Sequence, residues 1–227
     1  MDFFTYVGSQ LDQLVFYGQQ HFLLVLFAVG IAAAISLAAG TLLHTNRLTP
    51  DSWKRPVRAG SMEGLLIVSS AALTIPSLAL FGLLQPVLGL GATPSLTALT
   101  IYAIYPVLRN VVAGLSSVDD AVLESARGMG MSPLRRMLTI QLPLAWPVIL
   151  SGIRVAVLII IGVAVVAGAI NGPGFGSSLI LGLARLGSVN SFNQVLAATL
   201  GCLVVAAVYE IVFWIVQRFT TPRGIRV

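Results

Sequence analysis

Long apolar stretches separated by short polar loops dominate this chain of 227 residues. A bilayer crossing needs about 20 predominantly apolar residues. By that measure the pattern predicts five spans, at 22–43, 64–87, 95–116, 145–170 and 194–217. Because lipid offers no partners for backbone N–H and C=O groups, each span is expected to be a helix. The sequence therefore predicts an all-α integral membrane protein, with a single transmembrane domain over 1–227 whose core covers about 20–217.

Proline and glycine residues interrupt two of these spans. Pro76 removes a backbone hydrogen bond inside the second span, which predicts a kink there. The run Asn171-Gly172-Pro173-Gly174 ends the fourth span. The short apolar run at 179–183 that follows is interpreted as a re-entrant or surface helix.

The charged residues are few and unevenly placed. Only 9% of the residues are charged, against about 25% in soluble domains, which excludes a water-soluble core. Most basic residues fall in three regions, namely loop 44–62 (Arg47, Lys54, Arg55, Arg58), loop 117–143 (Arg127, Arg135, Arg136) and the tail (Arg218, Arg223, Arg226). The positive-inside bias places all three in the cytoplasm, so the N-terminus is expected outside and the C-terminus inside the cell membrane. The net charge of +5 then reflects orientation in the lipid bilayer, and no nucleic-acid partner is expected.

The polar loop 117–143 carries the most informative pattern. Asp119 and its neighbours predict the capped start of a helix over 119–129. Gly130 can end that helix, because glycine accepts the left-handed conformation of a C-terminal cap. Ser132 and Pro133 then start a second helix, and Pro143 marks the bend into the fourth span. The loop is therefore predicted to be a helix-turn-helix at the membrane surface.

This loop resembles the signature of bacterial ABC importer permeases, which reads Glu-Ala-Ala, three residues, Gly, nine residues, Ile, one residue, Leu-Pro. The matching residues are Glu124, Ser125, Ala126, Gly130, Ile140, Leu142 and Pro143, with Ser125 in place of an alanine. The resemblance implies the fold of type I ABC importer permeases, with five transmembrane helices. It also implies a cytoplasmic coupling helix, between the third and fourth spans, that docks on an ATP-binding subunit. Together with Ser132, the matching residues are the expected ATPase-coupling residues.

Four segments resemble permeases for glycine betaine, carnitine, choline and proline, namely 74–80, 105–110, 117–119 and 126–131. The resemblance implies an importer of a compatible solute, with permeases for polar amino acids or methionine as the alternative. The expected pathway residues are Thr74, Pro76, Ser77, Tyr105 and Asn110. A lipid-facing kink at Pro76 is an equally weighted alternative.

Aromatic and charged residues near the membrane offer two further hypotheses. Tyr102, Tyr105, Trp146 and Trp214 could form a site for a quaternary ammonium group, although anchoring at the membrane interface is the commoner use of such residues. Glu210 is expected to pair with Arg109 or Arg154, because an isolated charge inside a membrane is costly.

The sequence lacks the Gly-x-x-x-x-Gly-Lys-Ser/Thr phosphate loop, so the chain is expected to be no enzyme and to hold no cofactor or metal. A separate ATP-binding subunit would bind ATP and Mg²⁺. An extracytoplasmic substrate-binding protein and a second permease chain, identical or related, are the other expected partners. An ion-coupled secondary transporter is the alternative from another class, and its inverted repeats are not visible in the sequence.

Overall fold

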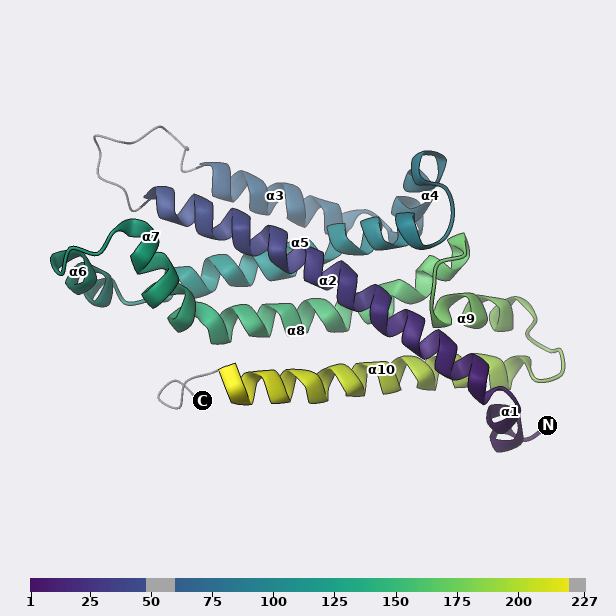
Figure 1. Ribbon diagram of the computed structural model, residues 1–227. Helices are drawn as coiled ribbons and strands as arrows, with labels where there is room; N and C mark the ends of the chain where they lie inside the picture. The colour runs from purple at the N-terminus through teal and green to yellow at the C-terminus, as the bar shows by residue number, and fades with distance from the viewer. Residues whose placement is uncertain (48–59, 221–227) are drawn as a thin grey trace.

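The protein is a bundle of helices in the computed structural model, which describes residues 1–47 and 60–220 (Figure 1). The basic residues Lys54, Arg55, Arg58, Arg223 and Arg226 lie outside the described residues. The elements in chain order are α1 (Phe3–Ser9), α2 (Leu11–Arg47), α3 (Gly60–Thr74), α4 (Ser77–Leu88), α5 (Ala92–Ser116), α6 (Asp120–Gly128), α7 (Pro133–Arg136), η2 (Met137–Gln141), α8 (Leu142–Val166), η3 (Ala167–Ile170), α9 (Phe175–Ala184) and α10 (Ser191–Thr220). Within the described part, four helices are long and apolar enough to cross a membrane, or five if the bent pair α3–α4 is one span. The all-α membrane fold is therefore confirmed.

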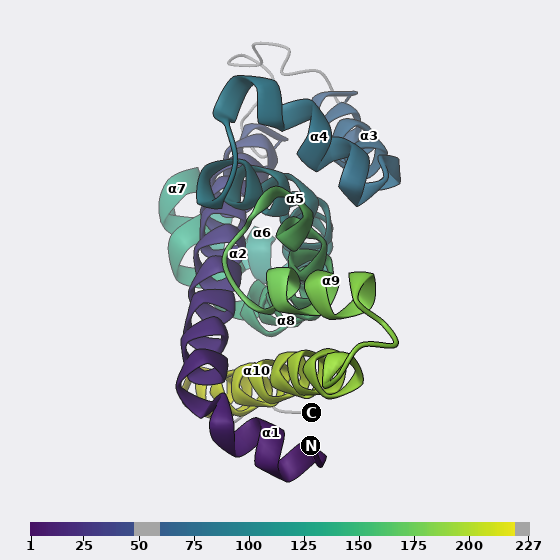
Figure 2. The ribbon, with the colours of Figure 1, turned by 90° about the vertical axis from the view of Figure 1, so that its right-hand side faces the viewer.

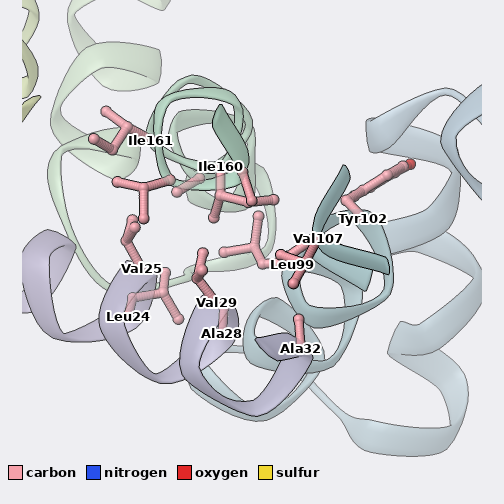
Figure 3. Packing of buried hydrophobic residues seen from close by; sticks show 14 of the residues in the cluster. Leu24, Val25, Ala28, Val29, Ala32, Leu99, Tyr102, Val107, Ile160 and Ile161 are labelled. Atoms are coloured by element: carbon pink, nitrogen blue, oxygen red, sulfur yellow. The ribbon is translucent and has the colours of Figure 1, made fainter. Parts of the chain in front are cut away.

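The long helices α2, α5, α8 and α10 run along a common direction, and α1 lies at the opposite end of the bundle from the last turn of α10 (Figure 1). Viewed along that direction, α5 and α8 occupy the centre, α3 and α4 lie on one side, and α10 lies on the other (Figure 2). The core between α2, α5 and α8 is packed by residues such as Val25, Ala28, Leu99, Val107 and Ile160 (Figure 3).

Small residues let α5 and α8 approach closely. A Cβ added to Gly152 of α8 would lie 2.2 Å from the Cβ of Asn110, and one added to Gly114 of α5 would lie 3.0 Å from the carbonyl oxygen of Ala145. Neither position has room for a larger side chain, because packed carbon atoms stay about 3.5–4.0 Å apart. These glycines therefore set the spacing of the two central helices.

The predicted kink at Pro76 is confirmed, and it is a full break. The segment expected to form one span over 64–87 consists of α3 and α4, which meet at 98°. Pro76 has no N–H to continue the helical ladder. The hydroxyl of Tyr102 on α5 donates a hydrogen bond of 2.7 Å to the carbonyl oxygen of Ile75. A side chain of the third span thus satisfies the backbone that the break leaves open.

The segment after α8 folds back onto the bundle. Asn171, with φ 58°, ends η3 in the left-handed conformation, and the apolar run 179–183 belongs to α9. A Cβ on Gly168 would lie 2.1 Å from the backbone carbon of Gly176. The backbones at the end of α8 and the start of α9 are therefore in direct contact, which a side chain at either glycine would prevent.

Two helices extend further than the pattern indicated. The first span is part of α2, which begins at Leu11 rather than near residue 22. At the other end of the bundle, Pro133–Ile170 is one helical run of 38 residues. Pro143 and Pro147 lie within this run and do not separate two helices. A π-helical turn, Met137–Gln141, precedes Pro143 in the run.

Candidate coupling loop and transport pathway

The helix α6 is closed at both ends by its own sequence. At the start, the carboxylate of Asp119 accepts a hydrogen bond of 2.9 Å from the Ala121 N–H. At the end, the Met131 N–H donates to the Ala126 carbonyl and the Gly130 N–H donates to the Arg127 carbonyl. Gly130 itself has a φ of 77°. These two bonds and the left-handed glycine form a Schellman motif, which gives Gly130 a physical reason to be glycine.

The faces of α6 differ in exposure. Glu124, Ser125 and Gly130 are exposed, as is Ser132. Ser132 caps α7 by accepting from the Arg135 N–H. Ala126, expected at a docking contact, is 1% exposed and lies on the inner face. The surface that α6 offers is therefore made by Glu124, Ser125 and the glycine turn, and Ala126 supports it from below.

The other expected coupling residues lie in a second place. Ile140 belongs to η2, while Leu142 and Pro143 begin α8. Leu142 and Pro143 line a largely apolar groove of about 500 Å³ together with Leu37, Ala38, Thr41, Leu138, Trp146 and Thr220. The Leu-Pro end of the motif thus lies where α2, α8 and α10 meet.

The basic residues of the loop also separate. Arg127 and Arg135 are exposed, whereas Arg136 is 1% exposed, with its Nε and Nη2 lacking hydrogen-bond partners in the described protein. Gln141, one π-turn later, is likewise buried without partners for its amide. Arg136 is therefore not available as a surface contact in this conformation.

The expected pathway residues fall into two groups. Thr74, Pro76 and Ser77 lie at the break between α3 and α4, where Thr74 and Pro76 are exposed. Tyr105 and Asn110 lie on α5. The Tyr105 hydroxyl accepts a hydrogen bond of 3.1 Å from Arg109, and the Asn110 amide donates to the Pro106 carbonyl at 2.8 Å. Because Asn110 packs against Gly152, its side chain lies in the contact between α5 and α8.

The four aromatic residues proposed as one quaternary-ammonium site have separate partners. Tyr102 bonds to the Ile75 carbonyl, and Tyr105 accepts from Arg109. The Trp146 indole donates to the Thr220 hydroxyl at 2.9 Å. The ring of Trp214 lies 5.4 Å from the guanidinium of Arg218. These residues therefore do not form a cage in this conformation.

The predicted pairing of Glu210 is confirmed, and its partner is Arg154. The Arg154 Nε lies 3.0 Å from Glu210 Oε1, and Arg154 Nη2 contacts Glu210 Oε2. This fork joins α8 to α10. Arg109, the alternative partner, bonds instead to Tyr105 one turn earlier on its own helix.

The sequence reasoning missed two contacts that tie α2 to α10 and to α8. Tyr209 on α10 stacks on Phe22 with ring centroids 4.5 Å apart and donates to the Phe22 carbonyl. His21 is fully buried, with its Nε2 3.2 Å from the Ile161 carbonyl oxygen. Both residues lie in apolar surroundings, and nothing in the linear pattern distinguished them from interfacial residues.

Among the described residues, no group of three or more His, Cys, Asp or Glu side chains is placed to hold a metal ion. The distinctive features are instead a capped, exposed helix next to a long continuous one, and a broken span beside the central pair.

Comparison with known proteins agrees with this geometry. Residues 62–223 match the family described as "Binding-protein-dependent transport system inner membrane component". Osmoprotectant import permease protein OsmW of Salmonella typhimurium is 33% identical over the full length of both chains. OsmY of the same organism is 32% identical over 95% of this chain and 86% of its own.

The fold is also found in a solved structure. An inward-facing structure of the MetNI methionine ABC transporter matches with a TM-score of 0.76 at 17% identity, covering 94% of this chain and 99% of that one. At this identity the likeness concerns the fold alone. The family match and the full-length relatives establish that the chain belongs to the inner-membrane permease components of binding-protein-dependent ABC importers, non-catalytic multi-pass subunits whose ATP is bound by a separate subunit.

Proposed function

We propose that this permease imports a compatible solute of the quaternary-ammonium type, such as glycine betaine, carnitine or choline. The observation that carries the proposal is the full-length similarity to an osmoprotectant import permease. Relatives from Bacillus subtilis point to the same solutes. They include a choline permease at 29% identity and a glycine betaine/carnitine/choline permease at 27% identity, each over more than nine-tenths of this chain.

The coupling loop gives the proposal its mechanism. The exposed face of α6 docks on the ATP-binding subunit through Glu124, Ser125 and Gly130. This loop and the C-terminus lie in the cytoplasm, and the N-terminus lies outside. The turn at Ser132 connects α6 to the helical run Pro133–Ile170. Closure of two ATP-binding subunits would move α6 and, through that run, the central helix α8. Two permease chains, identical or related, then enclose the pathway, since one bundle of four or five spans is small for that task.

The break at Pro76 supplies the second moving part. The ends of α3 and α4 carry the candidate pathway residues Thr74 and Ser77, while Tyr102 holds the break against α5. A shift of α5 against α8 would therefore reach the break directly. Ile140, Leu142 and Pro143 act at the joint between the coupling segment and the spans.

The test is uptake by the complete complex in proteoliposomes. Labelled glycine betaine, choline, carnitine and proline are offered with ATP inside, with the permease, its ATPase and its binding protein present. ATP-dependent accumulation of a quaternary-ammonium solute is expected. Accumulation of methionine or a polar amino acid in its place would overturn the proposed cargo.

Coupling and orientation are tested separately. Gly130→Glu is expected to abolish co-purification of the ATPase, because a long side chain adopts the left-handed conformation of Gly130, with a φ of 77°, poorly. Gly128→Glu serves as the control, because Gly128 is exposed on the same helix and an added Cβ there meets nothing within 4 Å. Single cysteines replacing Met129 and Val189, in a Cys202→Ser background, are expected to react from the cytoplasmic and outer sides respectively. Labelling of position 129 from outside intact cells would refute the orientation.

A further inference from the structure

The pair formed by Arg154 and Glu210 is placed unusually for a structural ion pair. Arg154 lies at the midpoint of α8, about 18 Å along the axis from either end. Glu210 lies about 15 Å from the end of α10. Both charges therefore sit deep within membrane-spanning helices. Yet their side chains are 49% and 32% exposed in the protomer.

Lipid hydrocarbon is an unfavourable environment for these two charged side chains. Ionised groups inside a membrane face a bundle interior or a water-filled cavity, because hydrocarbon cannot solvate them. The packed side of α8 is formed by other residues, among them Ile149, Ala156 and Ile160. The side of α8 and α10 that bears the pair is therefore expected to face the aqueous pathway shared with the second permease chain.

Polar residues follow the same side of α10. Thr199 and Gln217 lie 11 and 7 residues from Glu210, spacings that bring them to nearly the same helix face. Both are exposed, and so is Ser151, one turn from Arg154 on α8. Leu203, seven residues before Glu210, is also exposed on this face, so the face is mixed, with polar side chains on both sides of the ion pair. Trp214, one turn after Glu210, already has a cation over its ring, the guanidinium of Arg218.

We propose that Arg154 and Glu210 form the recognition station for a zwitterionic solute in the membrane, with Arg154 binding its carboxylate and Glu210 its quaternary ammonium group. This inference rests on the proposed function. Arg154 binds the carboxylate of Glu210 through two parallel contacts. Glycine betaine carries the same chemical group, so Arg154 can bind its carboxylate in the same way. In the empty protein each side chain neutralises the other. A bound zwitterion separates them and supplies one opposite charge to each.

Choline distinguishes the contact made by Arg154 from the contact made by Glu210. It has the quaternary ammonium group of glycine betaine and a hydroxyl in place of the carboxylate. Loss of Arg154 should therefore weaken transport of glycine betaine far more than transport of choline. Loss of Glu210 should weaken both. A pair that only ties α8 to α10 would affect the two solutes equally.

The experiment measures uptake of labelled glycine betaine and labelled choline by the complete reconstituted complex. Arg154→Gln is expected to raise the KM for glycine betaine about tenfold or more, the size of a lost charge-assisted contact, and to change the KM for choline much less. Glu210→Gln is expected to raise both. Arg109→Gln, at an exposed arginine that bonds to Tyr105, is the matched control and should show no preference between the solutes.

Two further variants keep the test decisive if removal of one charge prevents assembly. Arg154→Lys keeps the charge but loses the fork, and should raise the KM for glycine betaine selectively. The double variant Arg154→Gln with Glu210→Gln leaves no unpaired charge, and should weaken both solutes. Wild-type uptake of both solutes, combined with equal losses of glycine betaine and choline transport in Arg154→Gln and in Arg154→Lys, would overturn the station alone. A wild-type complex that carries neither solute would overturn the proposed cargo, and the station with it.

Discussion

Gly152 sets the distance between the two central helices, so filling that position tests the packing directly. In Gly152→Ala the new methyl group would lie 2.2 Å from Asn110 Cβ, 2.6 Å from its Cγ and 2.8 Å from its Nδ2. Carbon atoms pack at about 3.5–4.0 Å. Because the Cβ of Asn110 moves only with its backbone, α5 and α8 must separate by about 1 Å to relieve this contact.

The expected cost follows from that geometry. Overpacking of a well-packed core costs about 1–3 kcal/mol, and a chain of this size loses about 2–4 °C of Tm for each kcal/mol. We therefore expect Gly152→Ala to lower the midpoint of thermal unfolding in detergent by roughly 2–12 °C. The uptake rate should fall by more than the loss of folded protein explains, because α8 also connects the coupling segment to the membrane-spanning helices.

Gly162→Ala is the matched control. Gly162 lies in the same helix, and a Cβ there meets nothing within 4 Å, so its midpoint should stay equal or rise through better helix propensity. Adding Asn110→Gly to Gly152→Ala removes the Cβ that makes the closest contact and should recover part of the loss. If Gly152→Ala unfolded at the same temperature as Gly162→Ala, the close contact of α5 and α8 would be wrong.

Three other substitutions test the coupling helix and the broken span. Gly130→Ala must hold a side chain at a φ of 77°, at a cost of about 1–2 kcal/mol, so ATPase co-purification should weaken by about five- to thirtyfold, while Gly128→Ala should leave it unchanged. Asp119→Ala removes the N-cap of α6, worth about 1 kcal/mol, and should lower the ATPase activity stimulated by the loaded binding protein; full stimulation would show that the cap is unimportant. Tyr102→Phe leaves the carbonyl at the break without its hydroxyl donor, at about 1–3 kcal/mol, and should reduce uptake and Tm together, whereas Tyr17→Phe at the outer end of α2 should change neither.

The sequence predicted the spans well because lipid imposes a strong constraint on composition. An uncharged run long enough to cross the bilayer has few alternatives to a helix, so α5 and α10 lie where the pattern placed them. The effects of proline and glycine were also predicted correctly where they depend only on the conformation of the local backbone. Pro76 breaks the second span, and Gly130 takes the left-handed conformation at the end of α6.

What the sequence did not reveal depends on contacts between distant segments. The 98° angle at Pro76 requires a donor for the Ile75 carbonyl, and that donor comes from Tyr102, 27 residues later. Ala126 and Arg136 lie in a polar loop, which predicts exposure, yet tertiary packing buries both. Arg109 and Arg154 were the two partners predicted for Glu210, because both lie at a similar depth in the membrane. The choice of Arg154 depends on how α8 and α10 face each other, which the sequence does not show.

The helical run Pro133–Ile170 joins features that the sequence presents separately. Arg154 lies about 30 Å along this run from Pro133, where the run begins after α6. The contact between Gly168 and Gly176 holds the far end of the run against α9. A helix held at one end and displaced at the other pivots, and Arg154 lies between the two points. Its pair with Glu210 on α10 would be strained by that pivot, because a two-point fork tolerates little change in angle. Under the proposed function, movement of α6 would therefore be transmitted through α8 to the pair of Arg154 and Glu210.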